Sequence, residues 1–208
     1  MRVTRILGSV VALTGWAAGI AIPSASADPP CPDVEVVFAR GTGEPPGPGG
    51  VGQAFVDSLS SHLPERSVAV YPVNYPATPN YAESAAEGAD DASAHVRETV
   101  AACPNTKTVL GGYSQGAGVA SSATGKLPPP EADHVAAVVL FGRPASTYAS
   151  NSWGGPLPVI SPAYQPKTMD FCVPDDSICS EGNNPIAHVS YVGSDLIDQA
   201  AVFAAERL

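Results

Sequence analysis

The sequence predicts one α/β domain in which helices cover both faces of a mostly parallel β-sheet. Strand-like and helix-like stretches alternate along the chain, as they do when helical crossovers connect parallel strands. The strand-like stretches are apolar at nearly every position, which is typical of strands that are buried on both faces. The 208 residues correspond to a single domain, and the sequence contains no internal repeat.

The expected elements follow in order along the chain. β-Strands are predicted at residues 33–39, 67–73, 106–111, 135–141 and 167–173, where apolar residues cluster. Helices are predicted at 51–63, 81–102, 115–124 and 193–208, where apolar or alanine residues recur at helical spacing. The segments 41–52, 128–130 and 143–166 are rich in glycine, proline or both, so they are predicted as loops or breaks.

Residues 1–27 have the features of a cleaved secretory signal. Two arginines lead into an apolar stretch at 6–22, and the small residues Ala25-Ser26-Ala27 follow. A membrane anchor is the alternative, but the apolar stretch is at the short limit for a span and ends at a proline. We therefore expect a mature domain at 28–208 that is secreted, extracellular or retained at the cell wall, and that has no transmembrane segment.

Composition excludes several classes of partner. Asp and Glu total 20 against 10 Lys and Arg, for a formal net charge of −10, so nucleic acid and anionic membranes would repel the protein. Hydrophobic residues make up 44% of the chain, which permits a large core, and we expect a monomer. The four cysteines are compatible with two disulfide bonds. They are not at metal-ligand spacing with the histidines, and no dinucleotide or phosphate-binding fingerprint is present, so neither a metal nor a cofactor is expected.

The strongest chemical signal is Gly112-Tyr113-Ser114-Gln115-Gly116. It fits the pattern G-x-S-x-G and lies between a predicted strand and a predicted helix, which is the context in which this pattern marks a nucleophile. The turn is so sharp that side chains two residues before and after the serine would collide. We therefore predict that Ser114 is a nucleophile and that the backbone N–H of Gln115 points at the same place. The alternative is a glycine turn that only assists packing.

A serine nucleophile needs a general base, and the sequence has only four histidines. His62 and His95 precede the serine within predicted helices, where surface positions are expected. In this type of fold the order along the chain is serine, acid, histidine, which leaves His134 and His188. His134 precedes a strand and so lies at the wrong end of the sheet. His188 follows the last predicted strand, so it is the predicted base.

The acid should lie between Ser114 and His188. Asp175 and Asp176 come directly after the last predicted strand and lie between Cys172 and Cys179, whose spacing suggests a local disulfide. The residues themselves do not distinguish between these two aspartates. The complete set of acidic candidates in the interval is Glu131, Asp133, Asp170, Asp175, Asp176 and Glu181.

Four segments resemble the cutinase family of serine esterases, in particular the secreted cutinase-like proteins of actinobacteria. They are FARGTGE at 38–44, GGYSQGA at 111–117, CVPDDSIC at 172–179 and AHVSYV at 187–192, and their order and spacing extend over nearly all of 28–208. The resemblance implies a three-layer α/β-hydrolase fold with a central five-stranded parallel sheet and no lid. It also implies a serine carboxylesterase that works through a Ser-His-Asp triad and an acyl-enzyme.

The resemblance assigns further residues. It places the acid at Asp176, between the two cysteines. It implies an oxyanion hole formed by the backbone N–H groups of Thr42 and Gln115, with help from the Thr42 hydroxyl. It also implies two disulfide bonds, Cys31–Cys103 and Cys172–Cys179.

The expected substrates are small-molecule or lipid esters of short to medium chain length. Without a lid the site should be open, with a rim from residues 77–81 and 180–187. The second segment is polar, with Asn183, Asn184 and one large apolar residue, Ile186, whereas fungal cutinases have a more apolar rim. The alternatives are an acetylxylan-type carbohydrate esterase, a lipid or phospholipid hydrolase, and a secreted binding protein that has lost activity.

Overall fold

The computed structural model describes residues 30–184 and 186–208. The predicted secretory signal at 1–27 lies outside the described residues. No helix in the described ranges is both long and apolar enough to cross a membrane.

The central sheet has five strands that all pair in parallel, in the order β2-β1-β3-β4-β5. The order along the chain reverses between β1 and β3, because β2 lies on one side of β1 and β3 on the other. Ligand sites of open α/β sheets form at such a reversal, outside the carboxyl ends of the strands. The strands are β1 (Val34–Ala39), β2 (Val68–Pro72), β3 (Lys107–Tyr113), β4 (Val135–Phe141) and β5 (Thr168–Phe171).

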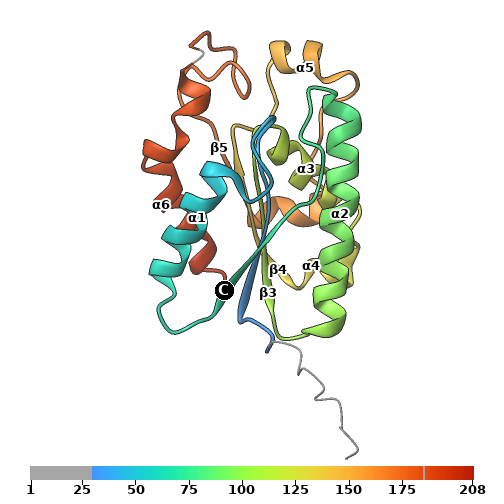
Figure 1. Ribbon diagram of the computed structural model, residues 1–208, viewed down its shortest axis with the longest axis vertical. Coiled ribbons are helices and arrows are strands. Elements are labelled where there is room, and N and C mark those ends of the chain that lie inside the picture. Colours follow the sequence, from blue (N-terminus) through green and yellow to red (C-terminus); the bar gives the residue numbers. More distant parts are fainter. Residues whose placement is uncertain (1–29, 185) are drawn as a thin grey trace, which may run out of the picture. The chain divides into compact units, whose positions relative to one another are not determined.

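Helices cover both faces of this sheet (Figure 1). The helices α1 (Gly49–His62) and α6 (Leu196–Ala205) pack on one face, and α2 (Tyr81–Ala102) and α3 (Gln115–Thr124) pack on the other. Successive residues of a strand point to opposite faces, so Val37 belongs to the core under α2 and α3 whereas Phe38 belongs to the core under α1 and α6. The predicted three-layer fold is confirmed.

The segments predicted as loops contain short helices, so that prediction was wrong in part. The segment 143–166 contains α5 (Thr147–Trp153) and the start of the 3-10 turn η1 (Pro162–Lys167), and 128–130 overlaps α4 (Pro129–Ala132). Local capping explains α5: the Ser146 hydroxyl accepts the N–H of Ala149, and Gly154 ends the helix in a left-handed conformation. A proline at the first position of α4 is compatible with a helix start.

Helix α1 begins at Gly49, inside the segment 41–52 that was predicted as a loop. Its first turn is held by Glu44, whose carboxylate accepts the N–H groups of Gly41 and Gly50. A Cβ atom at Gly52 would lie 2.6 Å from the ring of Phe38. The glycines at this point therefore allow α1 to approach β1 closely, and they do not interrupt the helix.

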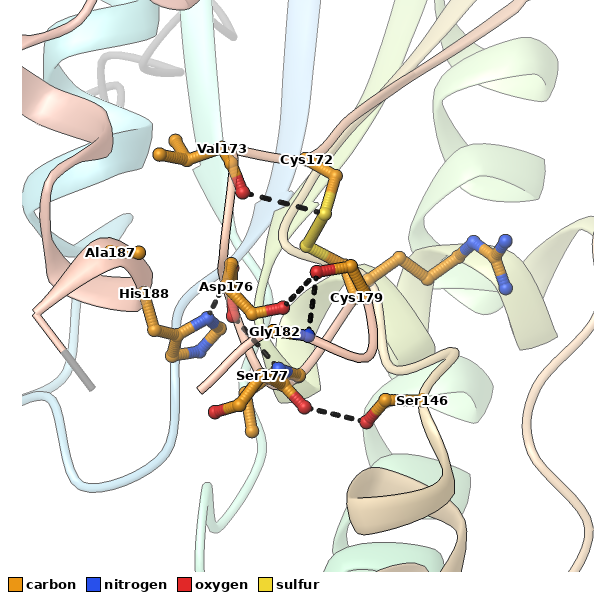
Figure 2. The surroundings of a disulfide bond; sticks show 12 residues. Ser146, Cys172, Val173, Asp176, Ser177, Cys179, Gly182, Ala187 and His188 are labelled. Atoms are coloured by element: carbon orange, nitrogen blue, oxygen red, sulfur yellow. Dashed lines mark hydrogen bonds and ion pairs between the residues drawn. A yellow bond between two sulfur atoms is a disulfide. The ribbon is translucent and has the colours of Figure 1, made fainter. Parts of the chain in front are cut away.

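Two disulfide bonds are present, in the pairing that the resemblance implies. Cys31–Cys103 joins the residues before β1 to the end of α2, and Cys172–Cys179 closes a short loop after β5. The loop is followed by the turns η2 (Ala187–Val189) and η3 (Tyr191–Gly193). Figure 2 shows Ala187 and His188 of η2 close to Asp176 of the loop, and the Cys179 sulfur lies 3.4 Å from the Tyr191 hydroxyl oxygen of η3.

Candidate active site

Ser114 occupies the sharp turn between β3 and α3. Its backbone has φ 56° and ψ −121°, a conformation that is costly for a residue with a side chain. A Cβ at Gly112 would lie 2.1 Å from the carbonyl oxygen of Gly116, and a Cβ at Gly116 would lie 2.0 Å from that of Ala39. The predicted steric reason for the glycines is thus confirmed, and the end of β1 is part of it.

The hydroxyl of Ser114 is connected through His188 to Asp176. Ser114 Oγ lies 2.8 Å from His188 Nε2, and His188 Nδ1 lies 2.8 Å from Asp176 Oδ2. Ser114 directly follows β3, whereas Asp176 and His188 come from the segment after β5. Figure 2 shows the side chains of Asp176 and His188 next to each other. A hydroxyl, an imidazole and a buried carboxylate in this sequence of contacts are typical of a nucleophile, a base and an orienting acid.

The two adjacent aspartates occupy different environments. Asp176 is fully buried, and its Oδ1 accepts the N–H of Ile178 at 2.8 Å. Burial alone would raise the pKa of Asp176, but hydrogen bonds from His188, the Ile178 backbone and Tyr191 outweigh it and hold the pKa below its usual value. Asp175 is exposed and has a φ of 66°. The geometry therefore brings Asp176, and not Asp175, to His188.

Two of the other histidines contact carboxylates on other parts of the fold. His62 lies on α1 and contacts Asp198 at 2.8 Å on the surface. His95 lies on α2 but is not a surface residue as expected: it is half-buried, lies 3.1 Å from Glu35, and stacks on Tyr71 with ring centroids 3.4 Å apart. The helical period alone did not show that this position faces β1.

The remaining candidates also lie away from Ser114. Asp170 pairs with Arg143 at 2.7 Å. Glu181 accepts the N–H of Thr147 at the first residue of α5. Three others lie before β4, at the amino end of the strands and therefore opposite to Ser114: Glu131, Asp133 and His134.

Thr42 and Gln115 lie beside each other at the reversal point of the sheet. In the described part of the chain, no acceptor is paired with the backbone N–H of either residue. Gln115 Nε2 donates to the carbonyls of Thr78 and Tyr81, so its Oε1 faces Thr42 and accepts the Thr42 hydroxyl at 3.1 Å. A hydroxyl has one proton, so in this structure the Thr42 hydroxyl donates to Gln115. The resemblance implies that this hydroxyl also helps to form the oxyanion hole, and for that role it would have to rotate away from Gln115.

Two tyrosines that the sequence reasoning missed contact His188 and Asp176. The Tyr113 hydroxyl donates to the backbone carbonyl of His188 at 2.6 Å, and its ring stacks on the imidazole with centroids 5.2 Å apart. The Tyr191 hydroxyl donates to Asp176 Oδ2 at 2.7 Å. Tyr113 lies within the G-x-S-x-G pattern and Tyr191 follows His188 by three positions. Proximity in sequence was therefore a signal, although it did not show where the hydroxyls point.

A cavity of about 270 Å³ opens over Ser114. The expected rim was wrong: within the described residues, nothing from 180–187 lines this cavity, and only Tyr81 of 77–81 does. One wall instead comes from α5, in the segment 143–166, and the lining is more apolar than expected. The lining side chains beyond the predicted site residues include Tyr81, Tyr148, Ala149, Ser152, Trp153, Ile178 and Val189.

The α5 wall is anchored to the loop that carries Asp176. The Ser146 hydroxyl donates to the carbonyl of Ser177 at 2.6 Å (Figure 2), and the N–H groups of Ala145 and Ser146 both donate to the carbonyl of Ile178. One short disulfide-closed loop therefore supports both the carboxylate and the cavity wall.

The sheet, the strand–turn–helix serine and the histidine–aspartate pair after the last strand define an α/β-hydrolase. The chain also matches the sequence profile of the Cutinase family over residues 30–208. It belongs to this family, and it is a carboxylic ester hydrolase.

Individual relatives agree with this assignment. The chain is 56% identical over 209 residues to Carboxylesterase Culp1 of Mycobacterium tuberculosis, with 98% of this chain and 95% of the relative covered. It is 45% identical over 217 residues to Phospholipase Culp4 of the same organism, with 98% and 92% covered. A Trichoderma reesei cutinase bound to a phosphonate inhibitor superposes with a TM-score of 0.68 at 36% identity, covering 85% of this chain and 77% of the cutinase.

Proposed function

We propose that the protein is a secreted serine carboxylesterase in which Ser114 is the nucleophile, His188 the general base and Asp176 the acid that orients His188. The observation that carries the proposal is the unbroken chain of 2.8 Å contacts from Ser114 Oγ through both nitrogens of His188 to Asp176. This series of hydrogen bonds ends at Ser114, which faces an open cavity.

Each step of the reaction can be assigned to these groups. His188 Nε2 takes the proton of Ser114 as Oγ attacks the ester carbonyl carbon. The tetrahedral intermediate collapses, and His188 returns the proton to the leaving alcohol. Water, activated by the same nitrogen, then attacks the acyl-enzyme and releases the acid and free Ser114. Asp176 stabilises the imidazolium in both half-reactions and keeps its own charge.

The negative oxygen of each tetrahedral intermediate needs hydrogen-bond donors. The backbone N–H groups of Thr42 and Gln115 supply them in this proposal, and the N-terminus of α3 adds a partial positive charge. Losing one such donor typically costs about 10²–10³ in turnover. The Gln115 side chain contributes indirectly, since it ties Thr42 to the carbonyls of Thr78 and Tyr81.

The cavity favours acyl groups of short to medium length. Its volume of about 270 Å³ is just below the usual range for ligand pockets, roughly 300–1,000 Å³. The apolar side chains of α5 and Tyr81 provide a wall against which methylenes gain about 0.8 kcal/mol each on burial. We therefore expect turnover to peak at acyl chains of about four to eight carbons, where this wall is filled, and to decline toward palmitate.

Hydrolysis of p-nitrophenyl butyrate, combined with a p-nitrophenyl phosphonate label, tests the proposal. We expect turnover of the butyrate ester, and a covalent phosphonate adduct on the peptide that contains Ser114, located by mass spectrometry. Ser114→Ala is the matched control and should take no label. An inert wild-type protein, or an adduct on another residue, would refute the assignment. A series of esters from acetate to palmitate then tests the acyl preference.

Secretion is part of the same proposal and has its own test. Both disulfide bonds are formed, which suits an oxidising destination, and residues 1–27 have the composition of a signal. Full-length protein expressed in an actinobacterial host should be recovered from the medium or the cell wall with Asp28 as its first residue. An intracellular product that keeps residues 1–27 would contradict this.

A further inference from the structure

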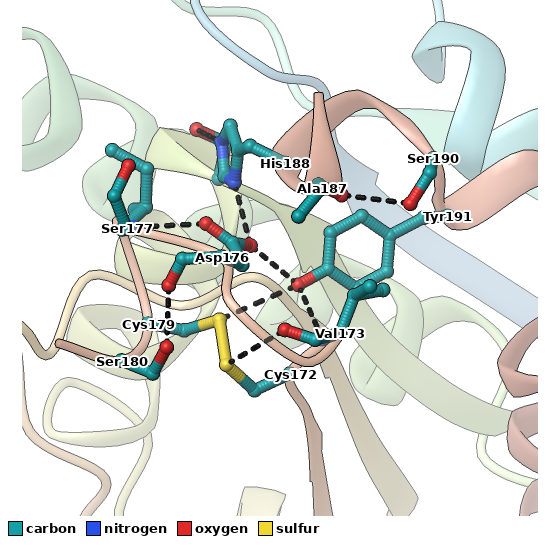
Figure 3. A network of polar contacts seen from close by, with 12 residues as sticks. Cys172, Val173, Asp176, Ser177, Cys179, Ser180, Ala187, His188, Ser190 and Tyr191 are labelled. Atoms are coloured by element: carbon teal, nitrogen blue, oxygen red, sulfur yellow. Dashed lines mark hydrogen bonds and ion pairs between the residues drawn. A yellow bond between two sulfur atoms is a disulfide. The ribbon is translucent and has the colours of Figure 1, made fainter. Parts of the chain in front are cut away.

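Asp176 is surrounded by three hydrogen-bond donors, and two of them share one oxygen. Its Oδ1 accepts the N–H of Ile178, whereas its Oδ2 accepts both His188 Nδ1 at 2.8 Å and the Tyr191 hydroxyl at 2.7 Å. Figure 3 shows the tyrosine approaching the carboxylate beside the imidazole. The proposed mechanism has so far used His188 and left Tyr191 without a role.

The direction of the tyrosine hydrogen bond is fixed by its surroundings. The Tyr191 oxygen accepts the N–H of Val173 at 3.2 Å (Figure 3), and this N–H can only donate. The carboxylate of Asp176 can only accept, so the one hydroxyl proton must point to Oδ2. Tyr191 is fully buried, and burial raises its pKa, which keeps the hydroxyl protonated.

Packing holds the tyrosine ring in this position. It meets the ring of Phe141 edge-on at 6.2 Å between centroids and that of His188 edge-on at 6.3 Å. Tyr113 packs on it at 5.7 Å. The hydroxyl is therefore held by aromatic rings on β3, β4 and η2 as well as by its hydrogen bonds, and it can fix the rotation of the carboxylate.

We propose that Tyr191 is a positioning residue of this site, whose hydroxyl fixes the Asp176 carboxylate and limits the negative charge that Asp176 presents to His188. The inference rests on the proposed function. A proton donated to Oδ2 disperses the charge on that oxygen. Without it, Asp176 would hold the protonated imidazole more strongly and would also be free to rotate.

Few other titratable groups face the pair. Tyr113 approaches from β3, but its hydroxyl donates to the backbone carbonyl of His188 and not to Asp176. Glu44, after β1, acts on Tyr113 from a distance. The sulfur of Cys179 lies 3.4 Å from the Tyr191 oxygen, but it is in a disulfide and does not titrate. Among these groups, Tyr191 is therefore the one whose substitution would change the hydrogen bonding at Asp176 Oδ2.

The test is the pH dependence of kcat/KM for Tyr191→Phe with p-nitrophenyl butyrate. We expect kcat to fall about ten- to hundredfold, as for a lost hydrogen bond to a charged group. We expect the acid limb of the profile to move to higher pH by about half a unit, because the remaining charge favours the protonated imidazole. Active-site titration with a phosphonate gives the concentration of folded enzyme, to which kcat and kcat/KM are normalised.

Tyr164→Phe is the matched control. Tyr164 is also fully buried, and its hydroxyl donates to the carbonyl of Leu127 at 3.1 Å, away from the site. It should lose stability but keep the wild-type pH profile and kcat. An acid limb in Tyr191→Phe that stays in place or moves to lower pH would overturn the proposal, whereas an inactive wild type or an active Ser114→Ala would overturn the proposed function itself.

A second variant covers the case in which Tyr191→Phe does not fold. Replacing Tyr191 with 3-fluorotyrosine keeps the ring and makes the hydroxyl a stronger donor. The acid limb should then move in the opposite direction, to lower pH, while the thermal midpoint stays close to that of wild type. A profile that does not move in this variant would also contradict a role for the hydroxyl in controlling the charge on Asp176.

Discussion

Two partly buried clusters among the described residues each bring a hydroxyl, an imidazole and a carboxylate into contact, and a third, Ser58, His62 and Asp198, lies exposed on the surface. The two partly buried clusters can be compared directly. One is Ser114, His188 and Asp176 at the carboxyl edge of the sheet. The other is formed by residues of β1 and α2 between the sheet and that helix: Thr99, His95 and Glu35. The residue types are nearly the same, but the order of the contacts differs.

In the first cluster the imidazole lies between the other two groups. His188 contacts Asp176 through Nδ1 and Ser114 through Nε2, so it can accept a proton at one nitrogen while the carboxylate stabilises the other. The serine faces a cavity that a substrate can enter.

In the second cluster the hydroxyl bypasses the imidazole. Thr99 donates directly to Glu35 at 2.7 Å, and His95 uses the same nitrogen, Nε2, toward both Glu35 at 3.1 Å and Thr99 at 3.4 Å. The His95 ring is also stacked on Tyr71. The imidazole is not placed to take the threonine proton, which already points to Glu35, so this cluster holds α2 against the sheet. If the proposed function holds, the order of contacts and access to substrate, and not residue type, distinguish the catalytic cluster from the structural one.

Exchanging the two hydroxyls for apolar side chains should separate these roles most clearly. Ser114→Ala should lower kcat on p-nitrophenyl butyrate by about 10⁶-fold without loss of circular dichroism or thermal midpoint. Thr99→Val should keep the wild-type kcat and lower the thermal midpoint, because Glu35 loses a donor. Substantial turnover in Ser114→Ala would mean that another residue is the nucleophile.

The acid of the first cluster can be tested against its neighbour. Asp176→Asn should lower kcat by about 10⁴-fold, because the amide no longer stabilises the imidazolium and favours the wrong tautomer. Asp175→Asn, at an exposed position, should have little effect. A larger loss in Asp175→Asn, measured under the same conditions, would reverse the assignment of the acid.

Each cluster lies near one disulfide bond. We expect the bond near the second cluster to contribute mainly to stability and the bond near the first cluster to contribute mainly to turnover. Cys31–Cys103 has a sequence separation of 72, so its loss should cost about 4 kcal/mol of unfolding free energy. The Cys172–Cys179 separation is 7, worth about 2.5 kcal/mol in the same treatment. Paired Cys→Ser substitutions, followed by thermal unfolding and kinetics, should show that the first bond mainly affects stability and the second mainly kcat. Equal kinetic losses in both pairs would remove the distinction.

The smallest expected effect is the acid dependence of the second cluster. Burial would raise the pKa of Glu35, but hydrogen bonds from His95 and Thr99 outweigh it and lower the pKa below its ordinary value of 4.5. A lowered folded-state pKa contributes stability that is complete above the unfolded value and lost as pH falls through the folded one. Glu35→Gln should therefore be less stable than wild type by about 1–2 kcal/mol at pH 7.

That difference should shrink as the pH falls from 4.5 through the lowered pKa of folded Glu35, because the carboxylate then becomes protonated in the folded wild type and its extra stabilisation is lost. Thermal unfolding of both proteins from pH 7 to pH 3 measures it, and kcat at pH 7 should be the same in both. A stability difference that stays constant over this range would show that the charge of Glu35 does not contribute.

Much of the fold and of the site could be predicted because the information lies in short contiguous segments. The bounds of α2, α3 and β4 match the predicted ones, since each segment is rich in alanine or other apolar residues and a Gly or Pro follows it closely. The nucleophile turn depends on five consecutive residues, and a steric requirement at two glycines made Ser114 identifiable. The position of His188 after the last strand followed from the rule that the carboxyl ends of parallel strands meet at one edge.

The tertiary structure decided what depends on contacts between distant segments. Sequence did not show that α5 forms within 143–166, because its cap and its anchors to Ser177 and Ile178 are set by packing. It did not show that His95 faces Glu35, or that Tyr191 reaches Asp176. A hydrogen bond requires two groups to meet within about 3 Å at a suitable angle, and residue order along the chain sets neither that distance nor that angle once the partners lie on different elements.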